Sequence, residues 1–540
     1  MLSYRKLAMR VLGRPLHTGG GSDSPRPASQ RAAALVLTAA MLTALTAPAF
    51  AETWDIEKGD ITVRAGKTEG TNMVSQGEQK DVEDTGTVIT GKSDKNTVTI
   101  EAKDKDDKVE VKLENVNIDA SSGNKAAVSV TGKGDTNIEL DGDNELKSGA
   151  GHAGLEHNKT DTSGELTIQD KDNNGSLEAV GGFKGAGIGS AGSNDAQVKI
   201  TGGNITATSD DWGAGIGSGS DGTAYVEITG GEINATGGYL GAGIGGGAFS
   251  SPDKIGNGNV VIKENAEIDN VQGGAYGAGI GGGVYGLGNV TIEGNTTVNA
   301  TGGAGAAGIG SGVDSVNDAA GNGNKITIRS NETGTPTVNA TGGESSIDEE
   351  TAEKIPGGAG IGSGAGDAKA DITLEGKVII VAKAGEGNAA IGANGIEQEF
   401  TGLAEGSSIT RSDSEGNDTT LPTDPVPAVP SASGGGSADA SVQESVFPGL
   451  VVTDKDSQRI SYTSIRGNNV LSIRVGRFTA SLRASLATLR QLRAEGIDTI
   501  TFQTILCSTT LSVDELLAMG GEDAEAVLTH RLTASSLTVG

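Results

Sequence analysis

A short glycine-rich motif that recurs along the chain constrains the fold more than any other feature of the sequence. "DDWGAGIGSGSDG", Asp210 to Gly222, holds five glycines around one large aliphatic residue, Ile216. Glycine loses the most conformational freedom on folding, so a segment of this composition does not hold itself as an isolated strand or helix. Its recurrence therefore indicates that each copy is held by contacts with other copies.

The motif aligns on a triplet of two small residues and one aliphatic residue. The triplets begin at Ala126, Ala153, Ala186, Ala214, Ala242, Ala278, Ala307, Ala359 and Ala389, in steps of 27, 33, 28, 28, 36, 29, 52 and 30 residues. Between triplets, alternating pairs such as Val226/Ile228 and a further apolar position such as Ile233 predict two more short strands.

One unit with three short apolar strands cannot bury its own apolar face. Stacking like strand over like strand, at about 4.8 Å per coil, builds a continuous core and pairs the backbone. The sequence therefore predicts an all-β fold, a right-handed parallel β-helix of about nine coils with three strands per coil.

The N-terminal segment has the features of an export signal. Arg31–Ala51 combines a basic flank, an apolar run and a small-x-small ending, and the run is shorter than the roughly 20 residues of a membrane span. We expect residues 1–51 to be a signal peptide with a long leader, cleaved after Ala51. The mature protein is then secreted or held at the cell surface, without inserting in the membrane.

The rest of the chain divides by composition. We expect residues 52–108 to form one or more capping coils and 109–400 the β-helix itself. Residues 401–441, rich in Pro, Gly and Ser, are expected to be a linker, and 442–540 a small α/β module with a helix around Ser481–Glu495.

Charge and cysteine content exclude several classes of function. Between Glu52 and Phe400 there are 53 acidic and 25 basic residues, a net charge of −28 against −29 for the whole chain. Nucleic acid is therefore not an expected partner, because phosphate binding needs a basic surface. The single cysteine, Cys507, excludes an internal disulfide.

Aromatic residues, only 3% of the chain, are placed regularly. Phe183, Trp212, Tyr239 and Tyr276 lie two or three residues before a triplet in four successive coils, and His152 takes the same place one coil earlier. Stacked coils would align these rings in a column that binds a polysaccharide, with Asp210 and Asp211 beside Trp212. The alternative is that the rings cover the glycine corner and stack on one another, at about 0.5–1.5 kcal/mol per pair.

One segment resembles the start of a calcium loop. "DKDNNG" places oxygen ligands at Asp170, Asp172 and Asn174, but position twelve of the loop is Gly181, where a glutamate would be needed. A turn rich in Asp and Asn that joins two strands is the alternative interpretation. Ca²⁺ is thus the one cofactor for which the sequence gives a signal.

The predicted β-helix contains many candidate acids for catalysis but few histidines and arginines. Carboxylates are abundant, among them Asp141 and Asp143, but His152 and His157 are the only histidines between Glu52 and Phe400, and no arginine lies between Arg64 and Arg329. Proton transfer needs a positioned acid and base, so we predict a protein that is not an enzyme. A polysaccharide lyase or hydrolase is the alternative, which a cleft with a lysine or arginine among three carboxylates would favour; a structural stalk is a third.

At "VEITGGEINATGGYLGAGIGGG", Val226 to Gly247, the chain resembles exported bacterial β-helix proteins with GAGIGG repeats that are described as containing a carbohydrate-binding domain. The resemblance covers roughly Trp54 to Phe400 and implies a pectate-lyase-like right-handed β-helix. It also implies binding of an extracellular polysaccharide, such as an acidic plant or host glycan, or an adhesin role, without cleavage of the ligand. It implies no particular binding residues.

Overall fold

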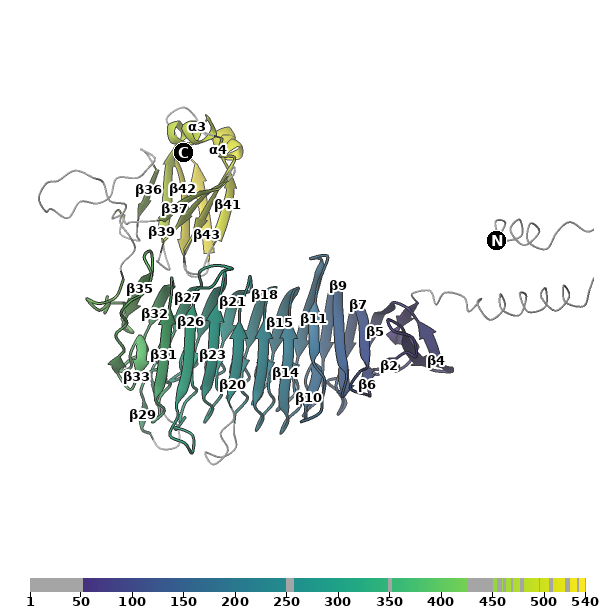
Figure 1. The fold of residues 1–540 in the computed structure, drawn as a ribbon. Coiled ribbons are helices and arrows are strands. Elements are labelled where there is room, and N and C mark those ends of the chain that lie inside the picture. Colours follow the sequence, from purple (N-terminus) through teal and green to yellow (C-terminus); the bar gives the residue numbers. More distant parts are fainter. Residues whose placement is uncertain are drawn as a thin grey trace, which may run out of the picture. The chain divides into compact units, whose positions relative to one another are not determined.

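In the computed structural model, short parallel strands are stacked coil over coil from β1 to β35 (Figure 1). The structure describes residues 52–248, 257–347 and 352–425, and in the C-terminal part 450–453, 459, 463–467, 470–475, 480–494, 496–504, 508–519, 525–531 and 534–539. The chain divides into two units, Met1–Val429 and Pro430–Gly540. The expected signal peptide lies outside the described residues, as do residues 426–441 of the expected linker.

Most of the described strands of the first unit form three parallel ladders. Ladder 1 contains β1 (Thr53–Asp55), β5 (Thr87–Ser93), β7 (Lys108–Asp119), β9 (Asp135–Lys147), β11 (Leu166–Gln169), β14 (Asp195–Ile200), β17 (Ala224–Ile228), β20 (Gly258–Ile262), β23 (Gly288–Glu293), β26 (Asn324–Arg329) and β31 (Ala370–Glu375). Ladder 2 contains the second halves of β5, β7 and β9, then β12 (Gly175–Val180), β15 (Asn204–Thr208), β18 (Glu232–Thr236), β21 (Glu267–Gln272), β24 (Thr297–Thr301), β27 (Thr337–Thr341), β32 (Ile379–Lys383) and β35 (Ser408–Ser412).

Ladder 3 is built from shorter strands. It contains β2 (Ile61–Ala65), β6 (Val98–Ala102), β8 (Val128–Gly132), β10 (Leu155–Lys159), β13 (Ile188–Gly189), β16 (Ile216–Gly217), β19 (Ile244–Gly245), β22 (Ile280–Gly281), β25 (Ile309–Gly310), β30 (Ile361–Gly362) and β33 (Ile391–Ala393). Each coil passes through ladders 1, 2 and 3 in turn. Such parallel crossovers are right-handed, and the predicted right-handed parallel β-helix is confirmed.

The repeat register found in the sequence is the register of ladder 3. The aliphatic residue of every triplet pairs with that of the next coil: Val128, Leu155, Ile188, Ile216, Ile244, Ile280, Ile309, Ile361 and Ile391. All of these side chains are fully buried. Burying one such side chain stabilises a fold by about 1.5–3 kcal/mol, so this column is a main part of the core.

The N-terminal end extends the helix beyond the predicted coils. β2 and β6 already pair in the register of ladder 3, with Ile61 beside Val98, so ladder 3 has eleven strands among the described residues where about nine coils were expected. The end is closed by an antiparallel hairpin of β3 (Asn72–Gln76) and β4 (Gln79–Asp84), which pairs with β2. Buried Trp54 donates from Nε1 to Asp84 at 2.9 Å and so fastens this hairpin to β1.

The β-helix continues past Phe400, where the sequence pattern ended it. β35 pairs with β32 in parallel, within residues expected to begin the linker. Its Arg411 is fully buried and donates to Asp424 at 2.7 and 2.9 Å and to Glu397 at 2.5 Å. Buried charges are tolerated only when they are paired and hydrogen-bonded, and this cluster closes the C-terminal end of the core.

In the second unit, the described residues form two four-stranded sheets and two helices. One sheet joins β36 (Leu450–Thr453), β39 (Ala480–Ser485), β42 (Glu525–Arg531) and β43 (Ala534–Val539); the other joins β37 (Thr463–Gly467), β38 (Val470–Arg474), β40 (Thr499–Gln503) and β41 (Ser508–Ser512). The helices are α3 (Leu486–Ala494) and α4 (Val513–Met519). The helix expected from Ser481 starts at Leu486, because Ala480, Leu482 and Ala484 alternate inward in β39. Among the described residues, no helix is long and apolar enough to cross a bilayer.

Glycine is required where adjacent coils approach in ladder 3. From β13 onward, the residue after the buried isoleucine of ladder 3 is glycine in each described strand, as at Gly217, which has a φ of +136°. A Cβ placed there would lie 2.0 Å from the carbonyl oxygen of Gly245 in the next coil. The glycines of the recurring motif therefore allow a close approach of backbones that no other residue permits.

Gly217→Ala is expected to lower the free energy of unfolding of the β-helix by at least about 3 kcal/mol, beyond ordinary backbone strain. Gly151→Ala is the matched control, because Gly151 also has a positive φ, +84°, but has nothing within 4 Å of its Cβ position. The control should lose only about 1–2 kcal/mol from the left-handed conformation. Urea unfolding followed by circular dichroism compares the two variants, and equal losses would contradict the close-approach argument.

A bulge in β21 brings three carboxylates together on the outer face of ladder 2. The register between β18 and β21 shifts after Ile233, which places Asp269 beside Glu232 and Glu267. Partial burial, a hydrogen bond with Glu232 and the charges of both glutamates raise the pKa of Asp269 from its ordinary 3.8 to about 7. The folded protein thus holds a proton here that the unfolded chain releases.

This shift predicts a pH dependence of stability. Between pH 3.8 and about 7 the folded state binds more protons at Asp269 than the unfolded state does, so the contribution of this group to stability is lost as pH rises through that window. Asp269→Asn removes the titrating group. Urea midpoints measured across the window should show that the wild-type protein loses stability relative to Asp269→Asn as pH rises, and parallel profiles would contradict the assignment.

Candidate functional site

Four aromatic side chains form a strip along one corner of the β-helix. This aromatic strip consists of Phe183, Trp212, Tyr239 and Tyr276, in the loops that lead into β13, β16, β19 and β22. Backbone hydrogen bonds stack these loops directly, as from the Tyr276 amide to the Tyr239 carbonyl at 3.3 Å. Phe183 and Tyr239 are 44% and 54% exposed, whereas Trp212 and Tyr276 are half-buried.

The strip has two chemically different halves. Tyr239 and Tyr276 contact each other edge to face, with ring centroids 5.7 Å apart. At the other half, the Lys184 ammonium lies 4.7 Å from the centroid of the Trp212 ring and 5.6 Å from that of Phe183. Both distances are in the range of a cation–π contact. The predicted column therefore exists, but a lysine covers part of it.

His152 does not take the place predicted for it in the column. A Cβ on Gly185 would lie 2.0 Å from the His152 carbonyl oxygen, so His152 stacks on the glycine that follows Phe183 and Lys184 in the next coil. Its ring pairs with buried Glu156, Nδ1 to Oε2 at 2.7 Å. It lines a separate cavity of about 420 Å³ together with Lys125 and Ser129.

Asp210 and Asp211 lie in the loop that carries Trp212. Burial and the neighbouring Asp210 raise the pKa of Asp211, while Lys184 and a hydrogen bond from the Trp212 side chain act in the opposite direction. The structure thus brings together the two predicted carboxylates, Trp212 and a lysine that the sequence interpretation missed. The feature of the sequence that could have revealed Lys184 is its position directly after Phe183, in the same corner loop.

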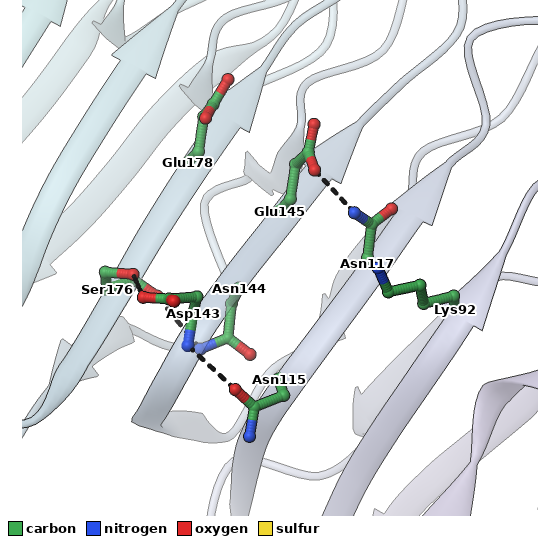
Figure 2. A pocket seen from close by; sticks show the side chains of 8 residues that line it. All are labelled: Lys92, Asn115, Asn117, Asp143, Asn144, Glu145, Ser176 and Glu178. Atoms are coloured by element: carbon green, nitrogen blue, oxygen red, sulfur yellow. Dashed lines mark hydrogen bonds between the residues drawn. The ribbon is translucent and has the colours of Figure 1, made fainter.

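A second candidate site is a polar groove on the outer face of ladder 2. It measures about 430 Å³ and is lined by Lys92, Asn115, Asn117, Asp143, Asn144, Glu145, Ser176 and Glu178 (Figure 2). Three successive strands, β5, β7 and β9, bend beside it at residues with left-handed backbones, Gly91, Asn115 and Gly142. Because of these bends, the first half of each long strand pairs in ladder 1 and the second half pairs in ladder 2.

Hydrogen bonds hold the walls of the groove. Asn117 donates to Glu145 at 2.6 Å, and the Ser176 hydroxyl donates to Asp143 at 3.0 Å (Figure 2). Glu145 and Glu178 are register partners on β9 and β12, so their side chains leave adjacent strands about 4.8 Å apart.

The floor of the groove is made by Asn144, which is 2% exposed. It accepts from the Val116 amide at 3.0 Å and donates to the Ser176 carbonyl at 3.0 Å. The groove therefore presents carboxylate, amide and hydroxyl groups from a rigid base. The sequence interpretation noted Asp143 alone, because outward polar positions show no apolar period.

The structure gives Asp170 a role in the turn between β11 and β12. Its carboxylate accepts from the Asn174 amide at 3.2 Å and the Gly175 amide at 2.9 Å, while the Asn174 side chain donates to Asp141. Asp172 is exposed. In the described part of the chain, no group of three or more His, Cys, Asp or Glu side chains is placed to hold a metal ion. The geometry favours the turn interpretation over the calcium loop.

Comparison with known proteins supports the repeat architecture. Residues 198–220, 226–248 and 290–313 match the family model described as Beta helix repeat. No curated protein and no solved structure matches the chain. The three matched segments each contain strand residues of ladders 1 and 2 and the glycine-rich corner, and in these segments the chain is similar to β-helix repeats.

Proposed function

We propose that the protein binds an extracellular polysaccharide through the aromatic strip, without cleaving it, as a surface-binding or adhesive protein. The observation that carries the proposal is the exposed ring of Tyr239, paired edge to face with Tyr276 of the next coil. A structural stalk has no need of exposed rings in successive coils. Large exposed rings cost solubility, and on a surface they are typical of binding sites.

The spacing of the strip suits an extended glycan. Sugar rings present apolar C–H faces that pack on aromatic side chains, and adjacent coils repeat at about 4.8 Å. A polysaccharide lying along the β-helix axis would therefore meet a ring at regular intervals. An acidic plant or host glycan is one ligand class under this proposal, and calcium is a candidate bridging ion.

Other features of the chain fit a role outside the cell. The segment before Ala51 has the pattern of an export signal, and the β-helix carries the excess of acidic residues that suits a soluble surface. Export and surface location belong to this proposal together with the glycan.

Tyr239→Ala is expected to weaken binding of the recognised glycan by at least about five-fold, since one stacked aromatic contact contributes about 1 kcal/mol. Tyr225→Ala is the matched control, because Tyr225 is 41% exposed but lies on β17 in ladder 1, outside the strip. Glycan arrays with and without Ca²⁺ identify the ligand, and calorimetry then compares the variants. Equal effects of the two substitutions would remove the strip from the binding site.

A polysaccharide hydrolase or lyase is the second candidate, and one observation favours it. The groove on ladder 2 holds Lys92 together with Asp143, Glu145 and Glu178, the combination of one basic residue and three carboxylates that such an activity needs. Carboxyl groups about 5–5.5 Å apart act as nucleophile and acid in retaining glycosidases, and Glu145 and Glu178 leave adjacent strands.

This alternative predicts that incubation with the bound glycan releases new reducing or unsaturated ends, and that Glu178→Gln abolishes the release. Glu232→Gln, on ladder 2 but outside the groove, is the control and should leave the release unchanged. If the wild-type protein forms no new ends on any glycan that it binds, the catalytic candidate is excluded.

A further inference from the structure

The Lys184 half of the aromatic strip has the composition of a cation-binding site. Its walls are the rings of Phe183 and Trp212, and Asp210 and Asp211 lie in the loop of Trp212. We call these four residues the cation cage. Lys184 places its ammonium within 6 Å of both ring centroids and interacts favourably with Asp211.

The chain's own lysine thus shows which chemical group the cage accepts. Ring faces carry negative electrostatic potential and attract ammonium groups, and the charge of Asp211, next to Asp210 in the chain, adds to that attraction. At an exposed site a lysine–ring contact is weak, about 0.5–1 kcal/mol, so a ligand that brings its own ammonium can replace it.

We propose that the cation cage binds the protonated amine of an amino-sugar residue in a glycan, which displaces Lys184 from the rings. The proposal rests on the proposed glycan-binding function of the strip and adds the charge of the ligand. Lys184 holds the site in the free protein and swings out when the sugar amine enters.

An anionic ligand fits this corner poorly. A carboxylate or sulfate that paired with Lys184 would also lie near Asp211, whose charge interacts with Lys184, on a β-helix whose net charge between Glu52 and Phe400 is −28. Like charges repel and disfavour binding of an anion, whereas an ammonium is attracted by the carboxylate. The negative electrostatic potential around the cage therefore favours a positively charged ligand.

A glycan fits better than a lysine-rich peptide because the strip continues beyond the cage. Tyr239 and Tyr276 lie in the next two coils, and their rings contact each other edge to face. An amino sugar in the cage would place the following sugar residues of its chain over these tyrosines.

The test compares two oligosaccharides with the same backbone, a β-1,4-linked glucosamine oligomer and its N-acetylated form, at a pH where the amines are protonated. The readout is the ratio of their affinities, measured by tryptophan fluorescence. Trp212 reports on the cage, because the other tryptophan, Trp54, is buried in the N-terminal cap.

Lys184→Ala should raise the ratio in favour of the glucosamine oligomer by about two- to five-fold, because the internal competitor is gone. Replacing Asp210 and Asp211 by Asn in the Lys184→Ala background should cancel the gain. Lys159→Ala is the matched control: Lys159 lies 4.7 Å from the centroid of the single ring of Tyr225, and its loss should leave the ratio unchanged.

Three results would overturn the cage: a ratio unchanged in Lys184→Ala, equal gains for both oligomers, or no binding of either oligomer to either protein. Oligolysine binding as tightly as the glucosamine oligomer would assign the cage to peptides and overturn the glycan class. Tyr239→Ala separates this proposal from the proposed function. If that substitution abolishes binding of the N-acetylated oligomer while Lys184→Ala leaves the ratio unchanged, the strip binds glycans and the cage does not select amines.

Discussion

The close approach of adjacent coils along ladder 3 is the constraint on which the rest of the structure depends. At Gly217 the next coil's carbonyl oxygen occupies the space of a side chain, so the repeat can accept only glycine there. The strand that contains it, β16, is two residues long, and its isoleucine is buried in the core. Because the coils from β13 onward all meet this requirement at the same phase, their corner loops stack in register. Tyr239 and Tyr276, far apart in sequence, become neighbours for that reason.

The buried register could be predicted because it is set by burial. A slip of one residue would turn each aliphatic side chain outward, so the inward positions of all three ladders are fixed by the sequence pattern. His152 shows where that logic ends, since a loop residue has no buried position to fix its phase and the histidine lies one step away from the aromatic strip. Arg411 shows the same at the C-terminal end. A single charged residue among polar neighbours forms no periodic pattern, so the sequence did not reveal that Arg411 is buried and that its ion pairs close the core.

Half of the candidate sites could be predicted. Aromatic residues are rare enough in this chain for their recurrence before the triplets to be noticed, and the structure places four of them in one strip. Lys184 and the groove residues are polar side chains among many others, and their significance depends on what faces them across coils. Asn117 and Glu145 are 28 residues apart and meet only because β7 and β9 bend at Asn115 and Gly142. Sequence patterns record which residues point inward, whereas binding chemistry depends on how outward residues combine.

The two surfaces use the same scaffold for different chemistry. The groove on ladder 2 presents carboxylates, amides and a hydroxyl on a straight stack of strands, a surface that exchanges hydrogen bonds with water or sugar hydroxyls equally well. The aromatic strip removes apolar surface from water, a gain that water does not compete for. Under the proposed function, a glycan bound along the axis would gain affinity mainly at the strip, while the charged groups beside it would set which glycan is accepted. Lys184, lying between rings and carboxylates, is the residue at which these two contributions meet.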